Sequence, residues 1–448
     1  MKEEHGTSST LRIGVLGCGT VGSALCRILT TEADAIAATT GIHLKLVAVA
    51  IRDPTRDDRS WTIPPELLRL DPETVITDPD VDLVVELIGG TGIAGELVSE
   101  ALRSGKTVVT ANKDLIADRG SALFSEAELS NSSLYFEAAV GGALPLIRML
   151  QLSMAGEPIQ SVVGILNGTT NYILTSMTES VKSFEEALTE AQDLGYAEAD
   201  PSADISGRDA AAKAAIIARV AFGVPIDIGE IYCTGIADIP PIAFQIAREL
   251  GCVIKLLATV DLGSNDGAVV ARVHPALVPD SHVLASVGGA YNAVHVRGAW
   301  LGECMLYGQG AGADPTASAV LSDILSAARG LPSHNRSTRL SKGVLADRSA
   351  RFCVVVKGCD QPGVLATVDG LFARHGIAVA TILQYDFEDS SRIVLTTRPA
   401  GERALSRAIE LLTDLDVVDD VEVAIRFMEF PQAAPVDDQH TKLTPEHR

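Results

Sequence analysis

Short apolar runs alternate with amphipathic stretches over the first third of the chain. The runs are rich in β-branched residues and predict strands, whereas the stretches between them carry apolar residues at helical spacing. The predicted strands cover residues 11–16, 44–51, 81–88, 106–110 and 134–140, and the helical patterns between them include 93–104 and 114–130. Strands that alternate with helices predict a parallel sheet with both faces covered, which is a doubly wound α/β fold.

The pattern changes after about residue 150. Helical, Ala-rich patterns dominate as far as residue 300, with fewer strand signals, and they predict a second, α+β domain. These patterns cover residues 183–193, 207–222 and 241–250. A polar, basic segment at 331–350 has no clear period and is interpreted as a linker, before strand-like and helix-like runs resume at residue 352. The tail after Phe430 combines proline with charge and is predicted to be disordered.

Length and charge limit the classes of function. A chain of 448 residues has room for roughly three domains. With 36 Lys and Arg against 58 Asp and Glu, the formal net charge is −22. A protein so acidic repels phosphate backbones and anionic lipid surfaces at long range, so we expect neither a nucleic acid nor a membrane as a partner.

Cysteine usage and the N-terminus bear on location. The seven cysteines are scattered and form no CxxC pair, so neither a disulfide framework nor a zinc site is indicated. The N-terminal residues 1–10 are polar and acidic, and no apolar run reaches 18 residues. We therefore expect a cytoplasmic protein without a membrane span.

A glycine-rich turn follows the first predicted strand. Gly17, Gly19 and Gly22 form a G-x-G-x-x-G pattern between that strand and an amphipathic stretch, which is the context that a dinucleotide fingerprint requires. The three glycines allow the tight turn, the approach of a pyrophosphate and close packing of helix and strand, and the helix N-terminus favours the phosphates. The pattern predicts a Rossmann-type NAD(P) site, and a purely structural turn is the alternative.

The end of the second predicted strand bears on the choice of dinucleotide. Arg52 and Asp53 stand there; an acidic residue would hold the ribose 2′-hydroxyl of NAD, and an arginine would accommodate the 2′-phosphate of NADP. Arg52 comes first and slightly favours NADP. Either charge could also belong to a solvated loop.

The densest chemistry lies in GYAEADPSADISGRDAAAK, residues 195–213. Four acidic residues precede Lys213, and they repel one another unless a cation such as a ligand ammonium lies among them. They are Glu198, Asp200, Asp204 and Asp209. Ser206 and Asp209 match a capping-box variant, which places Asp209 in the first turn of a helix.

Helical geometry orients Lys213 on this predicted helix. Lys213 lies within about 40° of Asp209 and the apolar stripe, whereas Arg208 and Arg219 lie about 120–140° away. Lys213 therefore points toward a core or a pocket. The alternative is a plain i,i+4 salt bridge between Asp209 and Lys213, worth a few tenths of a kcal/mol.

Three further signals accompany this loop. Asn112 and Lys113 follow the strand 106–110, at the sheet edge where open α/β sheets bind ligands, although an exposed loop lysine is the alternative. Residues 167–171 (NGTTN) are short and polar ahead of an apolar helix, and N-capping alone would explain them. Gly308, Gly310 and Gly312 precede a helical run at 316–328, or form a flexible turn. The nine histidines match no metal or triad pattern.

The motifs of the chain resemble those of a known family. In order they are GCGTVG, TANK, YFEAAVGGALP, NGTTNYIL, GYAEADPSADISGRDAAAK and GQGAGADPTASAV. Together they resemble homoserine dehydrogenase, of the longer type with a C-terminal ACT domain, over roughly residues 11–430. The resemblance implies NAD(P)-dependent interconversion of L-homoserine and L-aspartate 4-semialdehyde, within threonine, methionine and isoleucine biosynthesis.

The resemblance also implies roles for individual residues. Lys213 would pass a proton to or from the substrate oxygen, with Asp209 as the second catalytic residue that binds and orients the substrate. The implied substrate-binding residues are Glu198, Asp204, Lys113 and Gly195. The implied cofactor-binding residues are Gly17, Gly19, Thr20, Val21, Gly22, Arg52, Lys113 and Gly312. A sodium ion is implied near Glu137, Val140, Gly142 and Leu144.

Residues 352–427 resemble an ACT domain. Their pattern is strand, helix, strand, strand, helix, strand, with DQPGVL (residues 360–365) at the first strand-to-helix turn. The resemblance implies a ferredoxin-like fold that binds an amino-acid effector, with L-threonine as the expected feedback inhibitor. A dimerising module without an effector is the alternative.

These inferences define a domain plan. We expect an NAD(P)-binding Rossmann domain at 8–138 with a return segment at 305–345, a catalytic and dimerisation domain at 139–304, an ACT domain at 351–430 and a disordered tail at 431–448. The protein is expected to form a homo-oligomer, either a dimer or a tetramer. The alternatives are a non-catalytic amino-acid sensor and a Rossmann oxidoreductase for another amino acid semialdehyde.

Overall fold

The chain is seen in a computed structural model that describes residues 10–55, 59–180, 182–263, 268–333, 349–358, 363–387 and 390–428. It divides into two compact units. The first comprises Met1–Ala299 and Glu303–Ala346, and the second comprises Trp300–Gly302 and Asp347–Arg448. Most of the predicted linker, the start of the DQPGVL turn and the tail lie outside the described residues.

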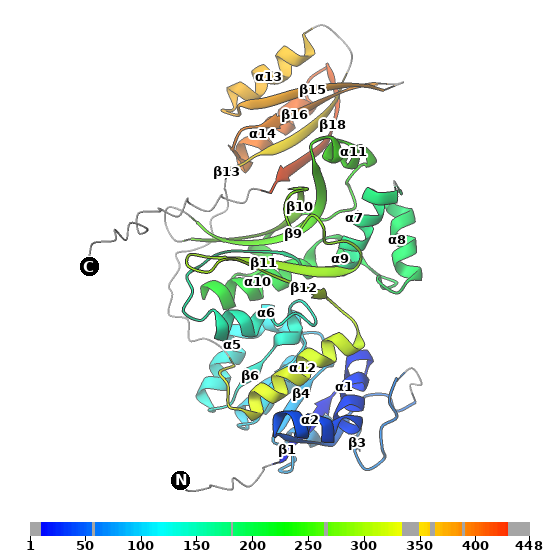
Figure 1. The fold of residues 1–448 in the computed structure, drawn as a ribbon, viewed down its shortest axis with the longest axis vertical. Helices are drawn as coiled ribbons and strands as arrows, with labels where there is room; N and C mark the ends of the chain where they lie inside the picture. The colour runs from blue at the N-terminus through cyan, green and yellow to red at the C-terminus, as the bar shows by residue number, and fades with distance from the viewer. Residues whose placement is uncertain are drawn as a thin grey trace, which may run out of the picture. The chain divides into compact units, whose positions relative to one another are not determined.

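The first unit contains a six-stranded parallel sheet in the order β3-β2-β1-β4-β5-β6 (Figure 1). The strands are β1 (Thr10–Leu16), β2 (His43–Ala50), β3 (Leu68–Arg69), β4 (Leu83–Glu86), β5 (Thr107–Thr110) and β6 (Leu134–Tyr135). This order, with a crossover on each side of β1, is that of the Rossmann fold and confirms the predicted doubly wound sheet.

Two details of this sheet differ from the sequence prediction. The strand predicted at 134–140 is wrong beyond residue 135, because the chain turns into the 3₁₀-helix η1 (Glu137–Ala139). Strand β3 was not predicted, since two residues carry no detectable period.

Helices cover both faces of this sheet (Figure 1). They are α1 (Thr20–Thr31), α2 (Ala33–Thr40), α3 (Glu73–Ile76), α4 (Ile93–Arg103), α5 (Lys113–Leu129) and, from much later in the chain, α12 (Ala313–Ala328). Helix α12 packs against α1, where Val320 and Ile324 join Ile13, Val15 and Leu25 in one buried core. A segment almost 300 residues downstream thus completes the dinucleotide-binding fold.

The rest of the first unit is built on a second sheet, in the order β12-β11-β7-β9-β10. Its strands are β7 (Ile159–Ile165), β9 (Cys252–Leu262), β10 (Val269–Pro279), β11 (Tyr291–Gly298) and β12 (Gly302–Gln309), and β8 (Tyr232–Cys233) pairs with β10. We expected fewer strands here. Strand β10 is buried along nearly its whole length, so both of its faces are largely apolar, and only Arg272 and His274 alternate with apolar neighbours.

Helices pack on this second sheet. The predicted patterns at 183–193, 207–222 and 241–250 correspond to α8, α10 and α11, respectively. The helices are α6 (Leu146–Arg148), α7 (Gly168–Ser180), α8 (Phe184–Asp193), α9 (Ser202–Ile205), α10 (Arg208–Phe222) and α11 (Pro241–Glu249), with the shorter turns η2 (Met149–Ser153) and η3 (Ile228–Glu230). Helix α10 contacts β9 and β10, and it also contacts α5 of the Rossmann part. It therefore joins the second sheet to the Rossmann part.

The second unit has its own sheet and core. An antiparallel sheet in the order β18-β14-β16-β15 is joined by two helices in the chain order strand, helix, strand, strand, helix, strand. The elements are β13 (Ser349–Ala350), β14 (Phe352–Gly358), α13 (Val364–Arg374), β15 (Val379–Phe387), β16 (Ser390–Thr397), β17 (Ala400–Gly401), α14 (Glu402–Thr413) and β18 (Val418–Phe427). Phe352, Val368, Phe372 and Leu412 form part of its core.

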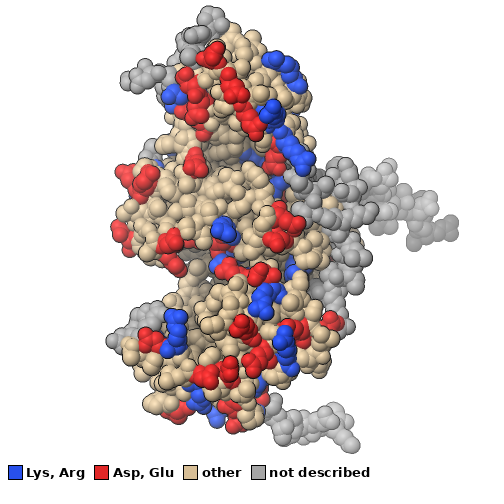
Figure 2. All heavy atoms as spheres, turned by 180° about the vertical axis from the view of Figure 1, so that it is seen from behind, with Lys and Arg blue, Asp and Glu red and all other residues tan. Residues whose placement is uncertain are grey.

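Acidic residues are spread over the surface. On the face in Figure 2, Asp and Glu lie among fewer Lys and Arg and form no single patch. None of the described helices is long and apolar enough to cross a bilayer.

Candidate active site

Helix α10 carries Lys213 and begins differently from the prediction. Gly207 precedes the helix in a left-handed conformation (φ 82°), and no side chain caps the helix. The predicted capping box of Ser206 and Asp209 is therefore wrong, because Ser206 instead ends α9. Asp209 does stand in the first turn of α10, as expected.

Lys213 lies on the buried side of α10. Its side chain is 11% exposed, and its Nζ donates hydrogen bonds to the carbonyl oxygen of Leu166 at 2.7 Å and to Oδ2 of Asp209 at 2.6 Å. Leu166 follows the end of β7, so the amine is held between α10 and that strand. Arg208, in contrast, is exposed. The orientation matches the one that helical spacing predicts.

Asp209 bridges two lysines. Its Oδ1 lies 3.1 Å from Nζ of Lys113, the first residue of α5, while Oδ2 accepts from Lys213. Burial opposes its charge, but Lys213 and then Lys113 lower the pKa of Asp209 to about 2. For Lys113 burial also opposes the charge, yet Asp209 and Asp114 raise its pKa. Asp209 is therefore an anion held between two ammonium groups from different parts of the first unit.

Asn167 is a member of this cluster that sequence reading missed. Its Nδ2 donates to Asp204 Oδ1 at 2.6 Å and to Asp209 Oδ2 at 2.9 Å, while its Oδ1 accepts from the backbone N–H of Thr170. The sequence marks the segment 167–171 as polar, with N-capping of the next helix as the alternative to a role in the site. Asn167 does both: it caps the start of α7 and joins two carboxylates.

The acidic loop does not form one cluster of four carboxylates. Asp204 and Asp209 meet at Asn167, whereas Asp200 is exposed and accepts from the backbone N–H of Ser202. Glu198 and Gly195 are also exposed, and the backbone carbonyl of Glu198 accepts from Gln192. The structure therefore brings Asp204, Asp209, Lys113 and Lys213 together, and leaves Glu198 and Gly195 on the open side of the loop.

The glycine turn has the shape of a phosphate cradle. A Cβ on Gly17 (φ 96°) would lie 2.7 Å from the carbonyl oxygen of Leu87, and one on Gly22 would lie 2.2 Å from that of Gly17. A Cβ on Gly19 would have no atom within 4 Å, so the backbone is open to a ligand there. Thr20 and Val21 begin α1, whose N-terminus faces the turn.

A cavity of about 500 Å³ adjoins this turn. It is lined by Gly17 and Gly19 on one side and by Arg52, Asp53 and Arg59 on the other. Arg59 was not predicted, because it lies six residues past Asp53 in a loop without a period. It donates to the carbonyl oxygens of Cys18 (3.1 Å) and Asp53 (2.5 Å).

Comparisons with known proteins agree with this geometry. The family model of homoserine dehydrogenase matches residues 145–325, and that of its NAD-binding domain matches residues 17–137. A homoserine dehydrogenase of Corynebacterium glutamicum is 42% identical, over 94% of this chain and 96% of its own. The chain belongs to the homoserine dehydrogenase family. It is accordingly an NAD(P)-dependent oxidoreductase that acts on a CH–OH group.

Solved structures support this assignment to homoserine dehydrogenase. A homoserine dehydrogenase from Thiobacillus denitrificans superposes with a TM-score of 0.86 at 35% identity, covering 94% of this chain and 99% of its own. A hyperthermophilic archaeal homoserine dehydrogenase in complex with NADPH superposes with a TM-score of 0.59 at 29% identity, covering 73% of this chain and 100% of its own. The alternative of an oxidoreductase from another semialdehyde family is set aside.

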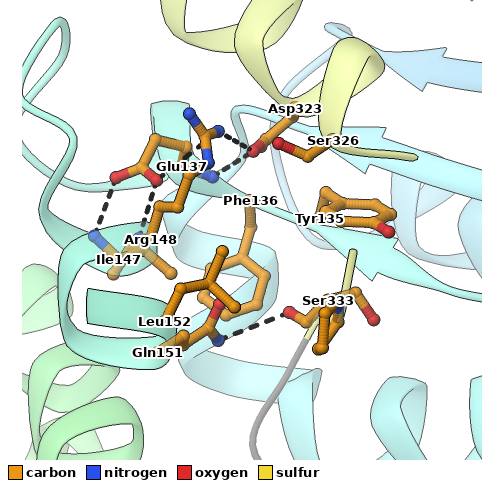
Figure 3. Close-up of a pocket in the computed structure, with 11 residues that line it drawn as sticks. Tyr135, Phe136, Glu137, Ile147, Arg148, Gln151, Leu152, Asp323, Ser326 and Ser333 are labelled. Carbon is orange, nitrogen blue, oxygen red and sulfur yellow. Dashed lines mark hydrogen bonds and ion pairs between the residues drawn. The ribbon is translucent and has the colours of Figure 1, made fainter. Parts of the chain in front are cut away.

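The segment after β6 is held by buried charges (Figure 3). The carboxylate of Glu137 accepts from the backbone N–H groups of Ile147 and Arg148, and Arg148 pairs with Asp323 of α12 at 2.8 Å. Burial, and then Asp323, raises the pKa of Glu137 to about 7, and burial raises that of Asp323 to about 6. In this homoserine dehydrogenase, α12 is thus tied to the segment that begins at Glu137.

The other predicted site residues lie near the end of that segment. Gly142 has no room for a side chain, since a Cβ there would lie 2.4 Å from the carbonyl oxygen of Gly310. Gly312 precedes α12 with φ 123°, at the N-terminus of the helix that packs on α1. Within the described ranges, no group of three or more His, Cys, Asp or Glu side chains could hold a metal ion.

Proposed function

We propose that Lys213 is the proton-transfer group of this homoserine dehydrogenase. The observation that carries the proposal is the buried Nζ, bound to the Asp209 carboxylate and to the carbonyl of Leu166. An amine fixed in this way offers its remaining hydrogen in one direction only. Replacement of Lys213 by alanine, followed by NADPH absorbance with L-aspartate 4-semialdehyde, tests the assignment.

The chemistry divides between cofactor and protein. A bound nicotinamide dinucleotide supplies or accepts the hydride. In reduction Lys213 donates a proton to the aldehyde oxygen as it becomes a hydroxyl, and in oxidation Lys213 accepts the hydroxyl proton. Asp209 stabilises the charged lysine and orients it.

The carboxylates suit an amino-acid substrate. Asp209 lies beside Lys213, and Asp204 joins Asp209 through Asn167. Carboxylate oxygens of this kind bind a substrate ammonium by charge-assisted hydrogen bonds. We assign Glu198 and Gly195, on the open side of the loop, to the substrate as well, with Lys113 between substrate and nucleotide. Glu198 would close on the ligand from its exposed position.

The residues around the glycine turn fit a dinucleotide, and we assign NADP as the preferred form. Gly17, Gly19 and Gly22, with Thr20 and Val21, would hold the pyrophosphate against α1. Two guanidinium groups, Arg52 and Arg59, line the adjacent cavity. The carboxylate of Asp53 accepts from the backbone and hydroxyl of Thr55, so it is engaged locally rather than held ready for a ribose hydroxyl.

Removal of the two arginines should discriminate between the cofactors. We expect Arg52→Ala and Arg59→Ala each to raise the KM for NADPH about tenfold, the value of one lost charged hydrogen bond, and to leave the KM for NADH nearly unchanged. Steady-state kinetics with both nucleotides measures this. Arg69→Ala is the matched control, because the Arg69 side chain on β3 donates to the neighbouring backbone carbonyls of Glu66 and Leu68. Equal increases for both nucleotides would contradict the assignment.

A sodium ion is proposed on the segment from Glu137 to Leu144. Its donors would be backbone carbonyls of Glu137, Val140, Gly142 and Leu144, since the Glu137 carboxylate is already engaged. Hard cations prefer such oxygen ligands. An unsatisfied polar group supports the fit. Asn292 is fully buried against Gly310, and neither polar atom of its amide has a hydrogen-bond partner among the described residues.

The second unit is proposed to be a regulatory ACT domain. Its sheet order and its two helices match the ferredoxin-like arrangement expected from the sequence. We assign it an amino-acid effector, L-threonine.

We further propose a cytoplasmic homo-oligomer. The rings of Tyr291 and Tyr307 are exposed and stacked, with their centroids 5.1 Å apart, and they would help to form the contact between subunits.

A further inference from the structure

A buried lysine outside the active site contacts no carboxylate among the residues that the structure describes. Lys255 of β9 is 4% exposed, and its Nζ donates to the carbonyl oxygen of Val287 at 2.7 Å and to Oδ1 of Asn171 at 3.1 Å. Both acceptors are neutral. Burial lowers the pKa of Lys255 to about 8, with the distant Glu179 opposing the shift. A buried cation of this kind is costly, so its contacts require an explanation.

Asn171 extends these contacts to a turn. It is 1% exposed and belongs to α7. Its Nδ2 lies within hydrogen-bond distance of three backbone oxygens, those of Val287 (3.1 Å), Gly289 (2.9 Å) and Tyr291 (3.2 Å). Lys255 and Asn171 together therefore fix the backbone of residues 287–291, in which Gly289 has φ 60°.

This turn packs directly on the start of α7. A Cβ on Gly168, the first residue of α7, would lie 2.7 Å from the carbonyl oxygen of Ala290. The turn also leads into β11, which pairs with β7 so that Ala293 is opposite Ile165. Residues 287–291 thus support the junction between β7 and α7 from two sides.

That junction carries hydrogen-bond partners of the groups assigned to substrate and proton. Leu166 provides the carbonyl that accepts from Lys213, and Asn167 provides the amide that joins Asp204 to Asp209. A displacement of the junction would move the carbonyl that accepts from Lys213 and the amide that hydrogen-bonds to both carboxylates.

We propose that Lys255 is a positioning residue for catalysis: through Asn171 and the turn 287–291 it holds the β7–α7 junction on which the carboxylates and Lys213 depend. Within the described part of the chain, Nζ of Lys255 hydrogen-bonds to Asn171 and to the carbonyl of Val287, and neither belongs to the proposed proton path or to the glycine turn. The proposal rests on the proposed function of Lys213 and extends it to a residue in a different strand.

Lys255→Met tests the proposal, because it keeps most of the length of the unbranched side chain and removes its donors. We expect the kcat/KM for L-aspartate 4-semialdehyde to fall about 10- to 100-fold, the cost of displacing reactive groups by about 1 Å. The loss should include a raised KM for the semialdehyde, while the KM for NADPH stays unchanged, since the glycine turn is built elsewhere. Lys255→Gln, which keeps an N–H donor, should recover part of the lost kcat/KM.

Lys106→Met is the matched control. Lys106 likewise donates to two backbone carbonyls, of Asp78 and Val81 at 2.6 Å each, but it lies in the Rossmann part. The Lys106→Met substitution should lower thermal stability and leave the KM values for NADPH and for the semialdehyde unchanged. Unaltered kinetics in Lys255→Met, or an equal rise in both KM values, would overturn the proposal, as would no difference between Lys255→Met and Lys255→Gln. A near-normal kcat in Lys213→Ala would instead refute only the proton-transfer assignment.

Discussion

Replacing Lys213 with alanine is expected to lower kcat by about 10²-fold or more, the usual contribution of a general acid–base group. The physical reason is that the variant lacks the amine that Asp209 and the Leu166 carbonyl hold in place. The KM for NADPH should change little, because the glycine turn lies on a different element. The decay of NADPH absorbance with L-aspartate 4-semialdehyde measures both quantities.

Two control variants sharpen this experiment. Arg208→Ala removes an exposed cation from the same helix and should leave kcat unchanged. Lys113→Ala removes the other cation of Asp209 and should raise KM values more than it lowers kcat, because we assign Lys113 to binding. A near-normal kcat in Lys213→Ala, or a larger loss in Lys113→Ala, would refute the assignment.

Deleting the residues after about 345 is expected to retain turnover and abolish inhibition by L-threonine. All residues that we assign to substrate, cofactor and proton transfer lie in the first unit, between Gly17 and Gly312. The second unit has its own core, around Phe352 and Phe372, and contributes none of them. Initial rates with increasing L-threonine, for the full-length and truncated chains, measure the effect.

A full-length variant keeps this test independent of the stability of the truncated chain. Gly363 belongs to the DQPGVL segment that resembles the ACT motif, and it precedes α13 with φ 94°, a conformation that strains any other residue. Gly363→Val should raise the threonine concentration needed for inhibition without changing kcat. Inhibition that survives the truncation would place the effector site in the first unit.

The sequence predicted the elements that carry a clear period or a specific motif. The strand, glycine turn and helix around Gly17 and the orientation of Lys213 both follow from local spacing, and the structure has them. The capping box at Ser206 failed because Ser206 ends α9 and Gly207, in a left-handed conformation, stands between it and α10. Strand β10 gave a weak signal because burial on both faces leaves only Arg272 and His274 to alternate with apolar residues.

The missed parts of the site depend on contacts between distant segments. Asn167 meets Asp209 across 42 residues, and Lys255 meets Asn171 across 84. Arg59 reaches the cavity beside the glycine turn from an irregular loop. Spacing along one helix or strand cannot predict such pairs. The sequence does mark the NGTTN segment as polar. Lys255 is a comparable signal, because it is a single charged residue within an apolar run.

A crystal structure of the protein with NADP and L-homoserine would test the central claim most directly. We expect Nζ of Lys213 to lie about 3 Å from the hydroxyl oxygen of homoserine, with the carbon that bears this oxygen about 3–3.5 Å from C4 of the nicotinamide. A hydroxyl bound to Lys113 instead, with Lys213 turned away from the reacting carbon, would contradict it.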